Sequence, residues 1–189
     1  FLILFLIKQV IWVHILVQLV ERHRINKKSY KGKILDKKLF LSKNLYNSAV
    51  YHFRKHFEAT GLYLGYHALD KQFALENQAD YRALPAKVSQ HVLMQVDEAF
   101  KSFFKALKSF KNNPSKFNSC PKLPGFKHKT KGRNLLVFTS QAISKKKLSP
   151  SGISELPLPT KIPHKDICQV RITPGDIYHT VEIVYNKSE

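Results

Sequence analysis

The stretch Cys168–Tyr185, with the sequence CQVRITPGDIYHTVEIVY, decides the fold class. Two segments within it, Cys168–Thr173 and Asp176–Tyr185, are rich in Val, Ile, Tyr and Thr and nearly alternate polar with apolar residues, which predicts two strands. The Pro174-Gly175 pair between them is typical of a turn, so we expect an antiparallel hairpin. Leu135–Ile143 has the same character and predicts a further strand.

Upstream of these strands the apolar residues follow helical spacing. Within Asp36–Thr60 they fall at intervals of three and four, which predicts a helix with one buried face. We expect Asp36 to cap the start of this helix and Gly61 to follow its end, because these residue types suit those positions. A shorter helix is predicted over Tyr66–Asn77.

A long helix is predicted to begin at Pro85, whose missing N–H is tolerated in a first helical turn. It is expected to end near Asn112-Asn113-Pro114. Its apolar stripe consists of Val88, Val92, Val96, Ala99, Phe100, Phe103 and Leu107. Helices that share such faces form a small bundle, and strands follow it along the chain, so the predicted fold class is α+β.

The overall charge indicates a polyanionic partner. The chain has 189 residues, with 32 Lys and Arg against 13 Asp and Glu, which gives a net charge of +19 and a pI of about 10.0. Its hydrophobic content of 43% supports a packed core and excludes a disordered polycation. An excess of positive charge disfavours compaction and is tolerated most often for nucleic acid, with an anionic membrane as the second possibility.

The first twenty residues allow several interpretations. Phe1–Val20 is almost entirely apolar and long enough to cross a bilayer core of about 30 Å, but Lys8 interrupts it. The absence of a preceding basic residue and of a small-residue cleavage site disfavours a secretory signal. A third interpretation is that Phe1–Leu16 is upstream sequence translated in frame, and we expect this one over a membrane anchor.

The residues of metal and catalytic chemistry form no recognisable set. Cys120 and Cys168 are far apart and lack a CxxC partner, which excludes a disulfide framework or a zinc ribbon and suits a reduced, cytoplasmic chain. His52 and His56 have a metal-binding spacing, but no Glu follows the first of them, so we interpret them as a solvated basic face. We therefore expect no metal site, no cofactor and no small-molecule substrate.

Thirteen basic residues and no acidic ones lie between Lys101 and Lys147. They are Lys101, Lys105, Lys108, Lys111, Lys116, Lys122, Lys127, Lys129, Lys131, Arg133, Lys145, Lys146 and Lys147. On the long helix, Lys101, Lys105 and Lys108 are expected to share the face opposite the Phe stripe. The alternating lysines at 127, 129 and 131 are expected to lie on one side of an extended segment that follows a phosphate backbone, with Phe126 able to stack on a base.

Four blocks of sequence resemble the N-terminal half of the OrfB/TnpB proteins, a family of insertion-sequence transposases that are similar to compact RNA-guided nucleases. The blocks are Val17–His23, Leu41–Asn47, Ala83–Gln90 and Lys122–Lys129, in the order and with the spacing of the family. In that family a β-barrel wedge is split by an inserted helical recognition bundle. The resemblance therefore implies a small antiparallel β-barrel interrupted by a helical bundle, with Arg22–Ile25 in the first strand.

The resemblance also implies a domain organisation. The parts are an extraneous apolar leader (1–16), the first part of the wedge (17–35), the helical recognition bundle (36–113), a basic Pro/Gly linker (114–132) and the rest of the wedge (133–189). The family's nuclease domain, which uses Mg²⁺, and its zinc ribbon are expected to be missing from this chain. The implied function is that of a non-catalytic, cytoplasmic fragment that binds guide RNA and DNA.

The expected nucleic-acid-binding residues combine the basic stretch with one face of the first helix. They are Lys43, Asn44, Asn47, Lys101, Lys105, Lys108, Lys122, Phe126, Lys127, Lys129, Lys131 and Arg133. Two alternatives stay open. The chain is either a subunit complemented by a separately encoded nuclease half, or a membrane-anchored basic protein that binds anionic lipid. The oligomeric state does not follow from the sequence.

Overall fold

The computed structural model describes residues 16–188, so the predicted apolar leader, apart from its last residue, lies outside the described residues. The structure combines helices with an antiparallel sheet, which confirms the predicted mixture of α and β elements. Within the described part, each helix is either too short or too polar to cross a bilayer.

Four strands form the sheet, and they come from both ends of the described chain. They are β1 (Leu16–Asn26), β2 (Leu136–Thr139), β3 (Ile167–Thr173) and β4 (Tyr178–Ser188). The strand order is β1-β4-β3-β2, with every neighbouring pair antiparallel. Among residues 16–188 this sheet is open, with β1 and β2 at its two edges. The first strand contains Arg22–Ile25, as the family resemblance implies.

The predicted hairpin is confirmed, because β3 pairs with β4 across the turn that contains Pro174 and Gly175. The turn requires glycine, since a Cβ on Gly175 would lie 2.2 Å from the carbonyl oxygen of Tyr178. The predicted strand Leu135–Ile143 is shorter than expected. It ends at Thr139 because Ser140–Ala142 form a 3-10 turn, in which Ile143 N donates to Ser140 O at 3.2 Å.

Four α-helices lie between β1 and β2 in the sequence. They are α1 (Tyr30–Thr60), α2 (Tyr66–Leu75), α3 (Ala79–Arg82) and α4 (Ala86–Asn112), and the sequence did not predict α3. Short 3-10 turns occur at Pro114–Lys116, Ser140–Ala142 and His164–Asp166. Helix α4 begins at Ala86, so Pro85 occupies its N-cap and not the first turn as predicted, and the helix ends where the sequence predicted.

The predicted cap of the first helix at Asp36 is wrong. The helix begins six residues earlier, at Tyr30, because the hydroxyl of Ser29 accepts a hydrogen bond from Gly32 N and satisfies the first turn. Asp36 therefore lies inside the helix, where its carboxylate is available for other contacts. The C-terminal prediction is confirmed, since Gly61 has φ = 68° and donates to the carbonyl oxygen of Phe57.

One hydrophobic cluster joins the helices to the sheet. In the helical part, the ring of Phe53 stacks against those of Phe100 and Tyr63, with centroid distances of 5.1 and 5.7 Å. In the sheet, Phe138 and Ile172 belong to the same buried cluster as Leu35 of α1. The bundle and the sheet therefore share a core, and the orientation of one constrains the other.

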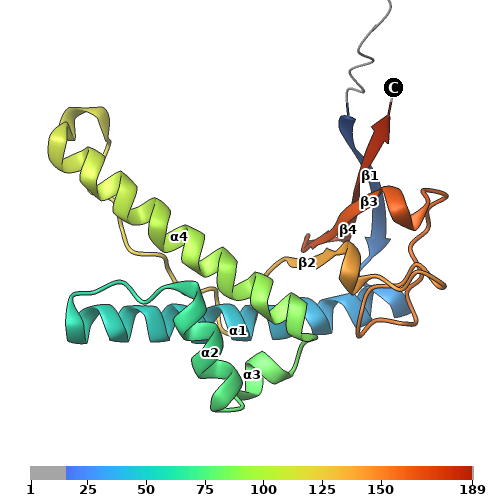
Figure 1. The fold of residues 1–189 in the computed structure, drawn as a ribbon, viewed down its shortest axis with the longest axis horizontal. Coiled ribbons are helices and arrows are strands. Elements are labelled where there is room, and N and C mark those ends of the chain that lie inside the picture. The colour runs from blue at the N-terminus through green and yellow to red at the C-terminus, as the bar shows by residue number, and fades with distance from the viewer. Residues whose placement is uncertain (1–15, 189) are drawn as a thin grey trace, which may run out of the picture.

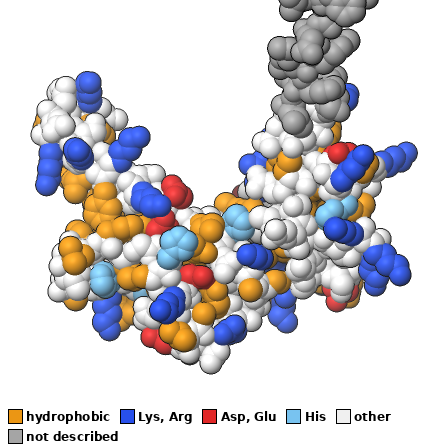
Figure 2. Space-filling model, in the orientation of Figure 1, with side chains coloured by type: hydrophobic (Ala, Val, Ile, Leu, Met, Phe, Trp, Pro, Cys, Tyr) orange, Lys and Arg blue, Asp and Glu red, His pale blue; other side chains and the backbone are white. Residues whose placement is uncertain are grey.

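The elements have the arrangement of two arms that rise from a common base. Helix α1 forms the base, α4 rises from one side of it, and the sheet rises from the other (Figure 1). The space-filling view shows a recess between the two arms, and Lys and Arg side chains on both of them (Figure 2). Side chains that are distant in sequence, on α4 and on the strands, thus face the same recess.

Candidate nucleic-acid interface

The C-terminal half of α4 carries a row of exposed lysines, which we call the α4 arm (Lys101, Lys105, Lys108 and Lys111). Its opposite face is apolar, with Phe100 buried as the helical spacing predicted, and Phe104, which was not in the predicted stripe, packed against Phe57 at 5.3 Å. Among these lysines only Lys101 has a carboxylate partner within residues 16–188. Its ammonium lies 2.7 Å from the carboxylate of Asp97, which raises the pKa of Lys101.

Helix α1 holds the basic strap, defined as residues 121–133, by hydrogen bonds to its main chain. The amide of Asn47 donates to Lys127 O at 2.9 Å and accepts from Lys127 N at 2.8 Å. The ammonium of Lys43 donates to Lys129 O at 2.6 Å, and the guanidinium of Arg54 donates to Pro124 O at 2.6 Å. These polar groups of α1 are therefore used to position the strap.

This arrangement changes the expected role of the α1 residues. Lys43 is only 3% exposed and its ammonium lies 4.0 Å from the centroid of the Phe40 ring, so it has no free surface for a phosphate. Burial lowers the pKa of Lys43. Asn47 is occupied at both ends of its amide, and Asn44 is half-buried on the same helix. We therefore remove Lys43 and Asn47 from the candidate contact residues.

The expectation that Lys127, Lys129 and Lys131 lie on one side of an extended segment is wrong. The chain turns after His128, because Gly132 N donates to His128 O at 3.0 Å and Lys131 N donates to the ring of His128. The side chain of Lys127 is half-buried, with its ammonium 4.8 Å from the centroid of the Tyr46 ring, and burial lowers its pKa. The other two lysines are exposed on the turn.

The remaining strap residues differ in how accessible they are. Lys122 is exposed. Phe126 is 52% exposed, so part of its ring is accessible for stacking, and the guanidinium of Arg54 lies 5.0 Å from the ring centroid. Phe117, which precedes the strap, packs edge-on against Phe110 at 5.6 Å. Lys122 and Phe126 thus remain candidates.

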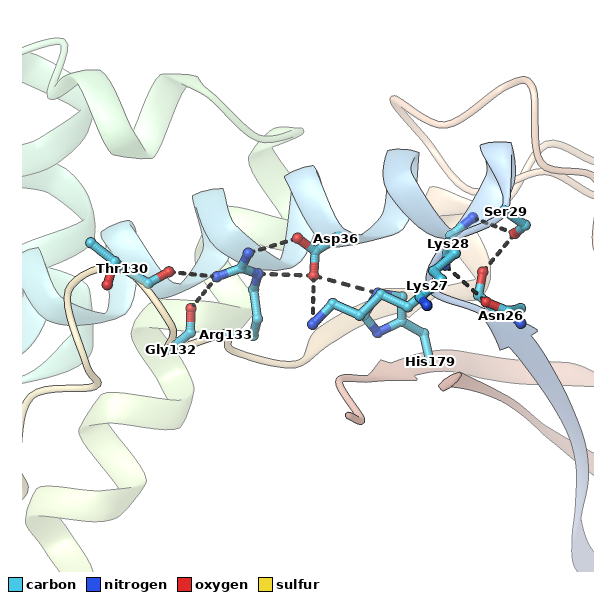
Figure 3. Close-up of polar contacts among 10 residues, drawn as sticks. Asn26, Lys27, Lys28, Ser29, Asp36, Thr130, Gly132, Arg133 and His179 are labelled. Carbon is cyan, nitrogen blue, oxygen red and sulfur yellow. Dashed lines mark hydrogen bonds and ion pairs between the residues drawn. The ribbon is translucent and has the colours of Figure 1, made fainter. Parts of the chain in front are cut away.

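Arg133 forms the most extensive polar contacts of the strap, and they are internal (Figure 3). Its Nε and Nη2 atoms donate to the two carboxylate oxygens of Asp36 at 3.0 and 2.6 Å. Its Nη1 atom donates to the main-chain oxygens of Thr130 and Gly132 at 3.0 and 2.8 Å. The guanidinium therefore has one N–H left, and the expected role of Arg133 as a close phosphate contact is not supported by its surroundings.

Asp36 is the centre of a charged network that joins α1 to the strap and the sheet (Figure 3). Hydrogen bonds from Arg133 hold the pKa of Asp36 below its usual value, and Lys27 at 3.4 Å adds to this lowering. The fully buried imidazole of His179 lies 3.6 Å from the same carboxylate. Neither ring nitrogen of His179 has a hydrogen-bond partner among residues 16–188, and burial lowers its pKa.

Two adjoining hollows line the recess between α4 and β2, and the sequence did not predict them. The first has a volume of about 370 Å³, the second about 500 Å³, and both include His91 and Met94. The first is also lined by Lys87, Gln90, Thr139, Ser140, Gln141 and Cys168, and the second by Tyr46, Gln95, Glu98, Lys127, Asn134 and Leu135.

Each hollow is lined by one residue with a buried side-chain polar atom that has no partner among the described residues. It is Thr139 Oγ1 in the first and Gln95 Nε2 in the second. The N-terminal part of α4 gives a partial signal for the first hollow, because Lys87, Gln90 and Met94 have the spacing of one helical face. The contribution of β2 has no such signal, since it depends on how the sheet packs against the helix.

The residues considered for metal binding are separate or engaged elsewhere. His52 was interpreted as part of a solvated face, but it is half-buried and packs against the ring of Phe73 at 4.9 Å. Residues 16–188 contain no group of three or more His, Cys, Asp or Glu side chains arranged to hold a metal ion.

No protein-family model matches this chain, and a comparison with curated proteins gives no match. The likeness of the four sequence blocks to the OrfB/TnpB family therefore stays a prediction.

Proposed function

We propose that this protein binds nucleic acid, with the α4 arm and the exposed part of the basic strap on the phosphate backbone. One observation carries the proposal. Of the thirteen cations between Lys101 and Lys147, eleven are exposed, and among those eleven only Lys101 pairs with a carboxylate of the described residues. Cations without internal partners keep their charge available for a polyanion.

The recess between α4 and β2 supports a role beyond phosphate contact. Glutamine side chains present a donor and an acceptor together, which suits the hydrogen-bonding edges of bases. Gln90 and Gln141 both line the first hollow, next to the exposed thioether of Met94. Thr139 also lines this hollow, and its buried Oγ1 has no partner among residues 16–188. We propose this recess as the position where bases are contacted.

The finer proposal follows the family resemblance. The chain would be the wedge and recognition portion of an OrfB/TnpB-type RNA-guided nuclease, with guide RNA and DNA as partners and without catalytic residues of its own. The described sheet would form part of a small wedge-like barrel. The position of the helices between β1 and β2 is consistent with a bundle inserted into a β domain.

The salt dependence of RNA binding tests the proposal. The triple substitution of Lys105, Lys108 and Lys111 by Ala removes three cations that have no carboxylate partner among residues 16–188. Each lost phosphate contact on a single strand flattens the slope of log K against log salt by about 0.7, so we expect a total change of about two units. Fluorescence anisotropy with a labelled single-stranded RNA measures this slope.

The matched control replaces Lys33, Lys37 and Lys71, which are equally exposed but lie on α1 and α2. Both variants lose three charges, so a general effect of net charge would change both slopes equally. An unchanged slope in the α4 variant would show that the arm is only a solvated face. Substitution of Gln90 and Gln141 by Ala should weaken binding without changing the slope, because these side chains are uncharged.

A further inference from the structure

The outer face of the sheet carries a second group of cations, distinct from the α4 arm. The pairing of the strands places two rows across the sheet. Arg22 of β1 lies opposite Glu182 of β4, which lies opposite Arg171 of β3. In the adjacent row, Arg24 lies opposite Thr180, which lies opposite Thr173.

A single carboxylate, that of Glu182, pairs with two of the three arginines of this face. Glu182 accepts from Arg22 Nε at 2.9 Å with one oxygen and pairs with Arg171 Nη2 at 3.0 Å with the other. Arg24 has no carboxylate partner among residues 16–188. The Nε atom of Arg171 is buried and without a hydrogen-bond partner in the same part of the chain. The face thus has an excess of positive charge and one unused buried donor.

The side chains surround a polar hollow. Its volume is about 560 Å³, and it is lined by Arg22, Arg24, Thr173, Thr180 and Glu182. Guanidinium groups bind phosphate oxygens with two parallel N–H groups, and threonine hydroxyls add further donors. Because strands hold alternate residues about 6.6 Å apart, Arg22 and Arg24 are spaced like successive phosphates of an extended strand.

We propose that this outer face of β1, β3 and β4 binds a phosphodiester backbone, at a place separate from the α4 arm. The inference rests on the proposed function, since it assigns a second segment of nucleic acid to the same protein. Glu182 holds Arg22 and Arg171 in position and lowers the charge of the face. The threonine row and the cross-strand arginines belong to a hydrogen-bonded sheet, so the contacts are fixed in direction.

The test uses a fluorescein-labelled single-stranded RNA and the full chain. The double variant Arg22→Ala/Arg24→Ala should bind about tenfold more weakly at moderate salt and show a slope flatter by roughly one to two units. The variant Glu182→Gln should change binding in the opposite direction, with a several-fold higher affinity, because it frees two arginines. Lys33→Ala/Lys37→Ala is the control with the same loss of charge.

A further variant separates a loss of binding from a loss of folding. Arg24→Ala removes a side chain that has no ion pair within residues 16–188, so its melting temperature should stay unchanged while the slope flattens by about 0.7. If these variants bind with unchanged slope while the α4 variant is impaired, the inference about the sheet is wrong and the proposed function stands. If the α4 variant is also unimpaired, the proposed function fails as well.

Discussion

The lysines of α4 and the basic residues of α1 differ in their surroundings, although both lie at helical spacing on long helices. Lys105, Lys108 and Lys111 are exposed and have no carboxylate partner among residues 16–188. Lys43 and Arg54, by contrast, donate to main-chain oxygens of the basic strap, and Lys43 is almost fully buried. The same residue types therefore provide a charged surface on one helix and internal support on the other.

This difference shows that an ammonium or guanidinium group is available to a ligand only where the protein does not already use its donors. On α1, main-chain oxygens of the strap already accept hydrogen bonds from those donors. On α4 the nearest acids, Asp97 and Glu98, lie in the turn before Lys101 and neutralise that lysine alone. Substitutions of the α1 side chains that hold the strap, and of Arg133, should consequently change stability, and substitutions on the α4 arm should change affinity.

The largest effect on stability is expected from Arg133→Met. This change leaves the carboxylate of Asp36, which is 21% exposed, without its bidentate partner. Removing one member of a buried pair costs about 3–5 kcal/mol, and the partial exposure of this pair reduces the expected loss to about 2–3 kcal/mol. Chemical denaturation at pH 7 measures it.

The pH dependence of this loss of stability shows whether it comes from the ion pair of Arg133 with Asp36. Arg133 lowers the pKa of Asp36, so the stability from the pair is present above pH 3.8 and is lost as the pH falls below that value. The difference between the two proteins should therefore shrink in acid. A difference that stays constant down to pH 2.5 would show that Arg133 stabilises the protein through packing against Phe40 instead.

A smaller loss is expected from Asn47→Ala. The substitution removes both hydrogen bonds to the main chain of Lys127, and we expect a cost of about 1–2 kcal/mol. Asn44→Ala, which removes the same amide from the same helix, is the control. RNA affinity measured on the folded variant at matched salt should fall less than for the α4 variant. Equal losses of stability in both Asn variants would contradict the role of Asn47 in holding the strap.

We expect the burial of His179 to cause a still smaller, pH-dependent loss of stability. Burial lowers its pKa below 6.5, with Asp36 opposing the shift and Lys27 and Arg133 adding to it. The unfolded chain therefore takes up a proton at a higher pH than the folded protein, and the stability contributed by neutral His179 falls as the pH drops below 6.5. Between pH 7.5 and 5.5 we expect a loss of about 1 kcal/mol.

The variant His179→Gln provides the comparison for this loss. Its unfolding free energy should depend less on pH over the same interval than that of the unchanged protein. His67→Gln serves as control, because His67 is exposed on α2. A pH dependence that is identical in all three proteins would exclude His179 as its source.

The smallest change in stability is expected from the triple substitution of Lys105, Lys108 and Lys111 by Ala. Exposed side chains without partners usually contribute within about 0.5 kcal/mol, so the melting temperature should hardly change. The same protein is predicted to bind RNA with a flatter salt slope. A loss of more than about 2 kcal/mol would show that these lysines also support the helix, and the contrast between α1 and α4 would then be weaker.

The amino-acid sequence by itself determined the type and approximate position of most elements. Apolar residues alternate in Cys168–Tyr185 and recur every three or four residues in Asp36–Thr60. These patterns indicate which side chains face the core, and each pattern can be read from its own segment alone. The Phe and Lys faces of α4 follow from the same periodicity. The start of α1 was predicted wrongly, because Ser29 and Asp36 are both residue types that cap helices. Only the hydrogen bond from Gly32 N to Ser29 in the folded protein distinguishes them.

Only the tertiary structure decided which cations are free. The hydrogen-bond partners of Lys43, Asn47 and Arg133 lie 80 or more residues away in the sequence, so no local sequence pattern predicts them. Likewise the outer-face arginines come together because β4 pairs with both β1 and β3, which joins the two ends of the described chain. Charge is a property of the residue, but its availability depends on donors and acceptors that folding brings within about 3 Å.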